Sequence, residues 1–314
     1  MTPGYKAMPR VSVIVPAYNA ERFLAATLQS ACASTYRDFE VVVVDDGSSD
    51  ATAAVAEAFA PTVRVIRQSN RGMSASRNRA VQDSDSEFVA LLDADDLWHP
   101  RKLELQIDAM DREPEAGLCF SEFVSWDGAS PVQFPAEPAL LLDERLSGWI
   151  YHQMLLTNFV LPSSALLRRT VFNDLGLFKC DNQKTDDWEY FVRASRSYRF
   201  IKLAAALVAY RQSPASLSRT VRTIDDTEVM RAQLIDRFGL VSPQGVAVDA
   251  NELARRRYKA RRDFADTHLA QGHFRLGLGR FTSLLLAGPH RVDSLETLFK
   301  SAMRRLRFTV LRGQ

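Results

Sequence analysis

Cysteine and long apolar runs are scarce in this 314-residue chain. Its three cysteines, Cys32, Cys119 and Cys180, are far apart and lack the spacing of a zinc site or a disulfide framework. No segment contains the roughly 18 uninterrupted apolar residues of a membrane-spanning helix, and residues 1–10 lack the apolar core of a signal peptide. We therefore expect a cytoplasmic protein that is neither secreted nor integral to a membrane.

Glycine is missing at the point where a dinucleotide-binding enzyme needs it. The first β-branched run leads into residues 16–20, which read Pro-Ala-Tyr-Asn-Ala. A Rossmann dehydrogenase carries its Gly-rich phosphate loop there, and a sugar nucleotidyltransferase needs glycines and basic residues to hold a triphosphate. Both classes are therefore excluded. Tyr18 instead offers a ring that can stack on a base, beside Asn19 as a hydrogen-bond donor and acceptor, although Tyr18 could also simply cap the sheet.

Charge is unevenly distributed along the chain. Residues 251–314 carry 14 Lys and Arg against 5 Asp and Glu, whereas the whole chain has a formal net charge of only +2. Such a basic segment suits peripheral contact with an anionic membrane, at the inner face of the plasma membrane, but it equally suits ordinary solvated helix faces. Nucleic acid is not an expected partner, because no nucleic-acid-binding motif accompanies the charge.

Apolar runs and helical spacings alternate through the first hundred residues. The pattern predicts strands at 11–16, 39–44, 63–67 and 87–92, with helices at 20–34, 52–59 and 73–82. This order predicts an α/β fold with a Rossmann-like, mixed but mostly parallel sheet between helices, and ligands at the carboxyl ends of the strands.

The second half of the chain has a less regular pattern. It predicts helices at 101–110 and 187–195 and strands at 117–126, 160–167 and 200–210. After about residue 220 the sequence is typical of helices, with breaks at Pro243, Gly272 and Gly288. We therefore expect a first domain at residues 1–220, followed by a basic, α-helical C-terminal extension at residues 221–314.

Three carboxylates follow the fourth predicted strand, at Asp93, Asp95 and Asp96. In an extended backbone, residues two apart point to the same side, so Asp93 and Asp95 are expected to point together and Asp96 away from them. Two such oxygen ligands suit Mg²⁺ or Mn²⁺, which takes substrate phosphates as further ligands. A helix start capped by an Asp is the alternative, but it needs one carboxylate rather than three.

A second acidic pair, Asp45 and Asp46, follows the second predicted strand. A carboxylate there can accept a hydrogen bond from the N–H of a pyrimidine base. Alternatively, the Asp-Gly pair at residues 46–47 forms an Asx turn before the next helix. Arg71 and Arg77 place cations near the same strand ends, where they suit a base or a diphosphate. Exposed arginines on a helix are, however, commonly just solvated.

The order of these motifs resembles that of the family 2 glycosyltransferases, which have the A-type nucleotide-diphospho-sugar transferase fold. The resemblance runs from about residue 11 to 219 and is carried by residues 12–19, 43–50, 70–78 and 92–96. It implies an inverting enzyme that moves a sugar from a nucleotide-diphosphate donor, with a UDP-sugar expected, to a hydroxyl of a cell-surface or lipid-linked glycan. A non-catalytic nucleotide-sugar-binding protein or a scaffold in glycan assembly remains the alternative.

The resemblance also implies roles for individual residues. Tyr18 and Asp46 would hold the base, Asp93 would lie near the ribose, and Asp95 would bind the Mn²⁺ or Mg²⁺ that bridges the diphosphate. The full set expected to bind the nucleotide sugar is Pro16, Tyr18, Asn19, Asp46, Arg71, Arg77, Asp93 and Ala94, with Asp95 and Asp93 as metal ligands.

The expected acceptor side lies at residues 185–189, which read Thr-Asp-Asp-Trp-Glu. By resemblance Asp187 is the catalytic base, with Asp186, Trp188 and Glu189 as acceptor-side candidates. An acceptor hydroxyl that attacks the anomeric carbon must lose its proton, and a carboxylate facing that carbon can take it. Alternatively, the two aspartates only cap a helix.

One position departs from the family pattern. Many relatives carry a His two residues after the equivalent of Arg211, where it can help to hold the metal or the diphosphate, and this chain has Ser213 there. The third protein ligand of the metal is therefore left open. Arg211 and Arg219 could compensate for it electrostatically.

Overall fold

The structure is a computed structural model that describes residues 8–181, 185–212, 223–271 and 273–287. It divides into two compact units, Met1–Ser216 and Leu217–Gln314, each of which is considered by itself. The domain boundary expected after residue 220 falls in the segment 213–222, outside the described residues.

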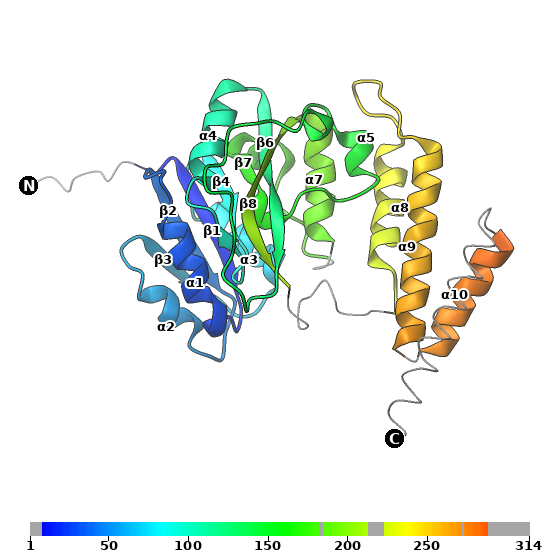
Figure 1. Ribbon diagram of the computed structural model, residues 1–314, viewed down its shortest axis with the longest axis horizontal. Helices are drawn as coiled ribbons and strands as arrows, with labels where there is room; N and C mark the ends of the chain where they lie inside the picture. Colours follow the sequence, from blue (N-terminus) through cyan, green and yellow to red (C-terminus); the bar gives the residue numbers. More distant parts are fainter. Residues whose placement is uncertain (1–7, 182–184, 213–222, 272, 288–314) are drawn as a thin grey trace, which may run out of the picture. The chain divides into compact units, whose positions relative to one another are not determined.

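The first unit is built on an eight-stranded sheet with the strand order β3-β2-β1-β4-β7-β6-β8-β5 (Figure 1). Its strands are β1 Val11–Ala17, β2 Phe39–Asp45, β3 Val63–Arg67, β4 Phe88–Leu91, β5 Leu97–Trp98, β6 Ala116–Trp126, β7 Leu166–Arg168 and β8 Arg199–Arg211. The four strands β1 to β4 are parallel, β7 and β5 are antiparallel to their neighbours, and β6 and β8 are parallel to each other. The predicted mixed, mostly parallel sheet is confirmed.

Helices cover both faces of this sheet. The helices are α1 Glu21–Cys32, α2 Thr52–Glu57, α3 Met73–Gln82, α4 Lys102–Arg112, α5 Tyr151–Met154, α6 Arg169–Leu175 and α7 Asp186–Ser197, with 3₁₀ turns η1 Glu144–Leu146 and η2 Pro162–Ser164. All seven residues of β1 are buried, as expected for a strand covered on both faces.

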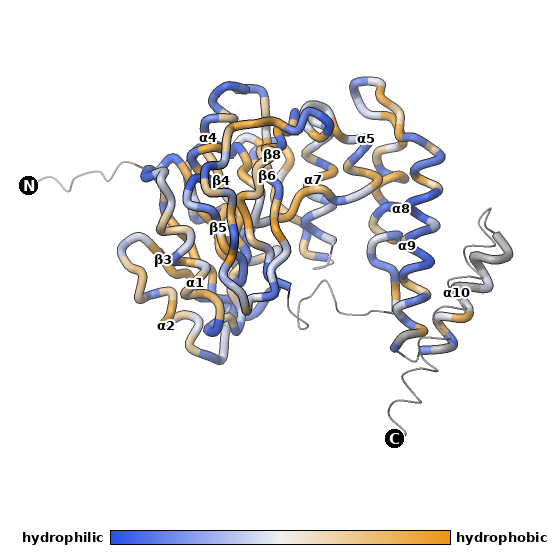
Figure 2. The backbone as a smooth tube through the Cα atoms, viewed as in Figure 1, coloured by the Kyte–Doolittle hydropathy of each residue, from blue (hydrophilic) through white to orange (hydrophobic). Residues whose placement is uncertain are grey.

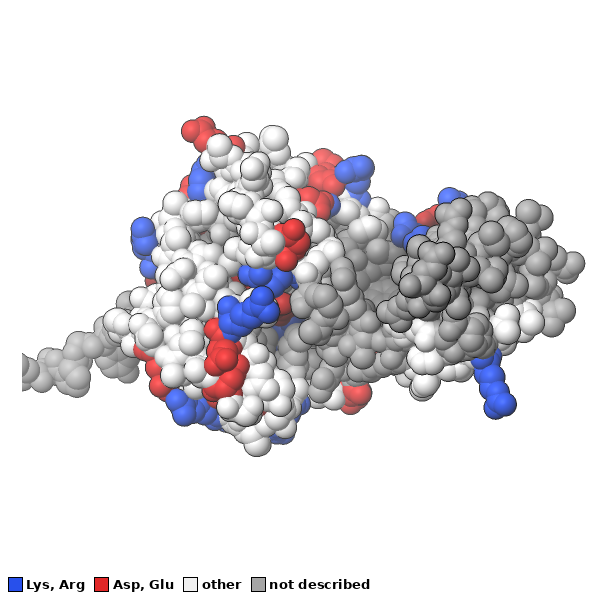
Figure 3. Space-filling view, turned by 60° about the horizontal axis from the view of Figure 1, so that its bottom comes forward, with Lys and Arg blue, Asp and Glu red and all other residues white. Residues whose placement is uncertain are grey.

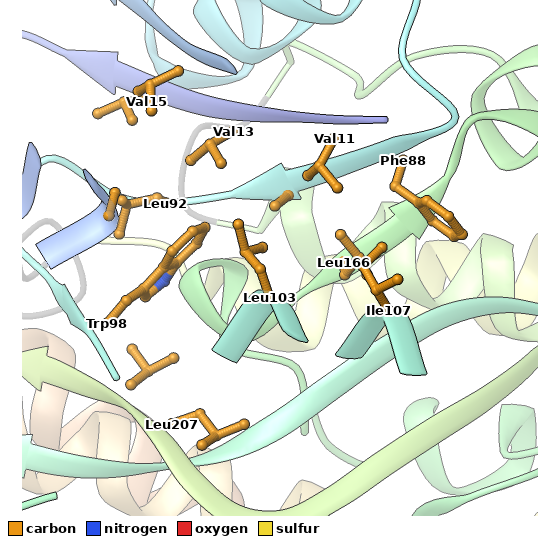
Figure 4. Close-up of a cluster of buried hydrophobic side chains, with 14 of the residues drawn as sticks. Val11, Val13, Val15, Phe88, Leu92, Trp98, Leu103, Ile107, Leu166 and Leu207 are labelled. Atoms are coloured by element: carbon orange, nitrogen blue, oxygen red, sulfur yellow. The ribbon is translucent and has the colours of Figure 1, made fainter. Parts of the chain in front are cut away.

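The core on one face joins β1 to α1 and α4. Val11, Val13 and Val15 alternate along β1 and lie on the same side of the strand, toward Trp98 and Leu103 (Figure 4). Hydrophobic residues are accordingly concentrated along the strands of this unit (Figure 2). This packing fixes the strand ends, where the polar side chains follow.

Two expectations about the strands are wrong. The strand predicted at 160–167 is mostly absent, because Pro162 opens the 3₁₀ turn η2 and β7 begins only at Leu166; proline lacks the N–H that a strand needs. The strand predicted to stop at Pro16 continues to Ala17. Along a strand, the backbone N–H and C=O groups of every second residue point to the same neighbouring strand, so those of Pro16 point to the same side as those of Ile14, toward β4. Because β4 ends at Leu91, no strand at that level needs the N–H that proline lacks.

The second unit contains α8 Asp226–Phe238, α9 Ala250–Ala270 and α10 Phe274–Ala287, so the expected C-terminal helices are confirmed. The N-cap side chains of Asp225 and Asp249 accept hydrogen bonds from the first turns of α8 and α9. A Cβ on Gly277 would lie 2.5 Å from Leu269 Cγ, so glycine permits the close packing of α10 on α9. Among the described helices, none combines the length and apolar content that crossing a membrane requires.

Candidate functional site

The carboxyl ends of the parallel strands lie along one edge of the sheet. Tyr18 follows β1, Asp46 follows β2, Asp93 follows β4, and Trp126 and Arg211 end β6 and β8. Most of the polar residues singled out in the sequence therefore lie along this edge, where a ligand of an open α/β sheet is expected.

Residues 93–96 form a tight turn, in which the N–H of Asp96 donates to the carbonyl oxygen of Asp93 at 3.2 Å. The extended backbone expected here is therefore wrong. The turn nevertheless leaves Asp93 and Asp95 close enough to interact: burial, and then the charge of Asp93, raise the pKa of Asp95 to about 6. Two carboxylates that compete for ionisation suit a divalent cation.

The third acid of the cluster, Asp96, is fully buried and has other partners. One carboxylate oxygen accepts from the hydroxyl of Ser163 at 2.5 Å, and the other accepts from the backbone N–H of Arg211 at 2.9 Å. Burial and the neighbouring Asp93 and Asp95 raise the pKa of Asp96 well above its usual value.

Arg77 lies among the acidic groups of the site. It is only 2% exposed, and its Nη2 donates to Asp93 Oδ1 at 2.6 Å. Its buried Nε finds no hydrogen-bond acceptor among the described residues. Burial raises the pKa of Asp187 to about 6, and the positive charge of Arg77 opposes that rise. The structure thus brings Asp93, Asp95, Asp187 and Arg77 into one electrostatic group.

Asp187 lies in the first turn of α7 and keeps part of its surface accessible. Its Oδ1 accepts from the N–H of Trp188 at 2.8 Å. The N-cap of α7 is Thr185 rather than either aspartate. Thr185 makes no side-chain capping hydrogen bond, and the bond from Trp188 to Asp187 shows that Asp187 stabilises the first turn of α7.

The three neighbours of Asp187 are buried in contacts that pack α7. Asp186 accepts from the hydroxyl of Ser74 on α3 at 3.0 Å, and Trp188 Nε1 donates to the carbonyl of Met154 on α5 at 2.8 Å. Glu189 pairs with Arg193 and Lys179 at 3.1 and 3.3 Å. These contacts hold α7 in place, and through it the position of Asp187.

The loop after β1 combines an exposed ring with a fixed backbone. Tyr18 is 53% exposed, whereas Asn19 has a positive φ of 48°. The Asn19 Oδ1 accepts from the N–H of Ser49 at 2.9 Å, and its own N–H donates to Ser48 Oγ at 2.9 Å. Asn19 therefore fastens this loop to the loop after β2 and leaves Tyr18 facing solvent.

Asp46 holds the segment that precedes α3. Its Oδ1 accepts from Gln68 Nε2 at 2.8 Å and from the N–H of Arg71 at 2.9 Å, and its Oδ2 accepts from the N–H of Gly72 at 2.8 Å. A carboxylate offers about four acceptor positions, so at most one is left for a base. The side chain of Arg71 is exposed, and Pro16 is buried within β1.

Arg211 supports the acidic turn from the end of β8. Its Nε donates to the carbonyl oxygen of Asp95 at 2.8 Å, and its guanidinium lies 4.0 Å and 4.6 Å from the ring centres of Trp126 and Phe23. The carbonyl oxygen of Ala94 accepts from Thr27 on α1 at 2.9 Å. Side chains from β8 and α1 thus bond to two carbonyl oxygens of the turn and fix its backbone.

The acidic turn fits a metal that is only partly coordinated by protein. The described residues contain no group of three or more His, Cys, Asp and Glu side chains that could hold an ion. Mg²⁺ and Mn²⁺ do not need such a group, because they bind through one or two carboxylates plus water and phosphate oxygens. The pair Asp93 and Asp95 fits this requirement. Ser213 and Arg219, expected near the metal, lie outside the described residues.

Ser163 is a buried part of the site that sequence reasoning missed. It contacts both Asp96 and the backbone of Asp93. The one available signal was a pair of hydroxyls, Ser163 and Ser164, within an otherwise apolar run. Both are fully buried, and buried hydroxyls need partners.

The family of the chain follows from its sequence over residues 12–176, more than half of its length, which match the model of glycosyl transferase family 2. The chain belongs to this family. The matched range includes Asp46, Asp93 and Asp95, but it ends before Asp187, so the role of Asp187 rests on its geometry and on the resemblance of the local motif.

Curated members of the family resemble this chain over much of its length. An uncharacterised glycosyltransferase of Rickettsia typhi is 28% identical over 60% of this chain and 61% of its own length. YwdF of Bacillus subtilis is 26% identical over 73% of this chain and 82% of its own length. GlyG of Streptococcus pneumoniae is 24% identical over 67% of this chain and 73% of its own length. The chain therefore spans less than two thirds of the Rickettsia relative.

Solved structures share the fold of this family 2 glycosyl transferase. Residues 1–349 of S. aureus TarS, solved in complex with UDP-GlcNAc, are 19% identical and have a TM-score of 0.61 over 91% of this chain and 83% of that fragment. The mannosyltransferase PcManGT of Pyrobaculum calidifontis, solved with GDP-Man and Mn²⁺, is 19% identical and has a TM-score of 0.63 over 96% of this chain and 81% of its own. At this identity the likeness shows the fold alone.

Proposed function

We propose that this protein is an inverting glycosyltransferase that uses a nucleotide-diphosphate sugar, with a UDP-sugar as the donor and a hydroxyl of a cell-surface or lipid-linked glycan as the acceptor. The observation that carries the proposal is the group formed by Asp93, Asp95, Asp187 and Arg77 at the carboxyl edge of the sheet. Family membership supports the donor class, and structures of the same fold bind UDP-GlcNAc and GDP-Man.

The donor would lie along the ends of β1, β2 and β4. The exposed ring of Tyr18 is available to stack on the base. Asp46 acts on the same side by fixing the backbone before α3. The carboxylates of Asp93 and Asp95 would hold Mn²⁺ or Mg²⁺, which when bound neutralises the negative charge of the leaving diphosphate.

Asp187 would take the proton of the acceptor hydroxyl. As that oxygen bonds to the anomeric carbon, the bond from this carbon to the diphosphate oxygen breaks and its electron pair leaves with the diphosphate. Attack from the side opposite the leaving group inverts the configuration. A base pKa of about 6 leaves Asp187 deprotonated at neutral pH and still able to accept a proton in the transition state.

Residues 1–220 would form the catalytic domain and residues 221–314 the helical, basic region. Cys32, Cys119 and Cys180 all carry free thiols, which supports a reducing, cytoplasmic location. Peripheral contact with an anionic membrane through the basic region remains part of the proposal.

A thermal-shift screen of UDP- and GDP-sugars with Mn²⁺ tests donor binding. A ligand at about 100 times its dissociation constant adds about 2.7 kcal/mol to the free energy of unfolding, which a melting curve detects. We expect stabilisation that needs both the nucleotide and Mn²⁺. Equal stabilisation in EDTA would contradict the metal-assisted mechanism.

The variant Asp95→Asn sharpens this test. It should melt close to the wild-type temperature but lose most of the Mn²⁺-dependent stabilisation and most transfer, because an amide carries no charge for the cation. Asp108→Asn, an exposed aspartate on α4, is the matched control and should behave like wild type. Unchanged Mn²⁺ dependence in Asp95→Asn would remove Asp95 from the proposed metal site.

A further inference from the structure

We propose that Ser163 is a positioning residue for the metal-binding turn, which it holds through the buried carboxylate of Asp96 and the backbone of Asp93. The inference rests on the proposed function of Asp93 and Asp95 as metal ligands. Ser163 itself lies in η2, some 70 residues further along the chain than the turn it contacts.

The Ser163 hydroxyl makes two hydrogen bonds to the turn. It donates to Asp96 Oδ2 at 2.5 Å and accepts from the N–H of Asp93 at 3.0 Å. A hydroxyl has a single O–H and two acceptor lone pairs, so this pattern uses its donor fully. Its first bond fixes the C-terminal end of the turn and its second fixes the N-terminal end. Asp95 therefore lies on a segment that is held at both ends.

Ser163 is itself held rigidly. It is completely buried, and its carbonyl oxygen accepts from Trp98 Nε1 at 2.8 Å. Trp98 belongs to β5, which pairs with β8. Ser163 thus fixes the turn relative to the edge of the sheet. Residues that support a metal ligand from behind commonly orient it in this way.

This arrangement explains why the motif contains three acids. The two oxygens of Asp96 are occupied by the Ser163 hydroxyl and the N–H of Arg211. Asp96 is fully buried, so its carboxylate acts as an internal anchor for the turn. Asp93 and Asp95 are left to face the ligand.

The neighbouring serine offers a matched control. Ser164 is also completely buried and also belongs to η2, but its hydroxyl donates to the carbonyl of Leu161 within the same turn. Ser163→Ala and Ser164→Ala therefore each remove one buried hydroxyl from the same 3₁₀ turn. Only the first removes hydrogen bonds to the acidic turn.

The test measures Mn²⁺ binding to the full-length protein in the presence of UDP by calorimetry, alongside the melting temperature without ligand. We expect Ser163→Ala to raise the Mn²⁺ dissociation constant about 10-fold or more, the usual effect of losing support behind a ligand. Ser164→Ala, which loses one hydrogen bond within its own turn, should also lower the melting temperature but leave Mn²⁺ binding unchanged. Asp96→Asn, which loses one acceptor, should change Mn²⁺ binding in the same direction as Ser163→Ala.

Two results would overturn the inference: a Mn²⁺ dissociation constant for Ser163→Ala within twofold of wild type, or equal weakening in Ser163→Ala and Ser164→Ala. Either result leaves the proposed function standing as long as the wild-type protein binds Mn²⁺ with UDP. Failure of the wild-type protein to bind them would instead refute the proposed function itself.

Discussion

The carboxyl group of Asp187 is deep enough in the protein for burial to raise its pKa to about 6, although part of the residue stays accessible. Arg77 limits this rise, because a nearby positive charge favours the carboxylate. A general base works best when its pKa lies near the working pH. Arg77 therefore contacts one of the proposed metal ligands, Asp93, and also limits the pKa of the proposed base, Asp187.

The variant Asp187→Asn should retain binding of UDP and Mn²⁺ but lose transfer by a factor on the order of 10² or more, because an amide cannot accept the proton. Rates of wild-type transfer should fall below about pH 6, since only the deprotonated carboxyl group of Asp187 acts as a base. Steady-state rates between pH 4.5 and 8 would measure both effects.

Asp186→Asn is the internal control. The buried carboxylate of Asp186 accepts a hydrogen bond from Ser74 on α3, so this variant should lower the melting temperature while the rate constant of transfer stays close to that of wild type. A larger loss of transfer in Asp186→Asn than in Asp187→Asn would mean that the base has been assigned to the wrong residue.

Some of the site could be predicted residue by residue, and some could not. Asp93 and Asp95, the proposed metal ligands, and Asp187, the proposed base, could be singled out from their residue types and motifs. Ser163 could not, because its function depends on a contact with Asp96 across 67 residues of chain.

At the scale of elements, the position of α3 depends on hydrogen bonds made by the two residues that precede it in the sequence. The N–H groups of Arg71 and Gly72, which precede the helix, both donate to the buried carboxylate of Asp46. Arg77 lies on the second turn of this helix and reaches Asp93. The carboxylate at the end of β2 thus sets the position of a cation that lies at the end of β4.

We expect Asp46→Ala to reduce the free energy of unfolding by at least about 2 kcal/mol, since three donors lose a buried acceptor. It should also weaken the binding of UDP and of pyrophosphate together, because Arg77 moves with α3. Denaturant unfolding and calorimetry with both ligands would measure these changes.

The adjacent variant Asp45→Ala removes a carboxylate that, among the described residues, accepts only from the N–H of Ser48, and it should be milder. If Asp46→Ala weakened UDP binding while pyrophosphate binding stayed intact, Asp46 would be a direct ligand of the base instead.

The parallel strands could be predicted from the sequence, and the short strands could not. β1 and β2 are seven-residue runs rich in valine, which mark buried strands by themselves. β5 has two residues and β7 has three, too few for any periodicity. β5 pairs with β8 at the edge of the sheet, and β7 lies between β4 and β6, so both strands depend on pairing in the folded sheet.

For the molecule as a whole, fewer basic residues of the second unit are free to contact an anionic surface than its composition suggests, because several of them pair with acidic residues. Arg256 pairs with Glu252 at 2.6 Å and Arg257 with Glu228 at 3.0 Å. On the face shown in Figure 3, Lys and Arg are interspersed with Asp and Glu over the described residues. Arg255 and Lys259 keep the most exposed side chains among the paired cations of α9, at 69% and 65%.

The double variant Arg255→Gln and Lys259→Gln should therefore weaken binding to anionic liposomes several-fold at low salt, since each cation near such a surface contributes up to about 1 kcal/mol. The difference should fade as salt rises, because the Debye length is about 8 Å at physiological ionic strength. Liposome sedimentation across a salt series would measure it. Arg145→Gln, an exposed cation of the first unit, is the control. Indistinguishable sedimentation of the double variant and wild type would mean that Arg255 and Lys259 take no part in a membrane contact.

The contact between Asp96 and the backbone of Arg211 joins residues that are 115 positions apart. During synthesis, β1 to β4 leave the ribosome long before β8, and domains tend to fold as units in the order in which they emerge. The carboxylate of Asp96, which anchors the acidic turn, therefore has both of its donors only after residue 211 has been synthesised. A chain that stops before residue 211 lacks this donor to Asp96 and part of the sheet that carries it, so we expect incomplete products to be inactive.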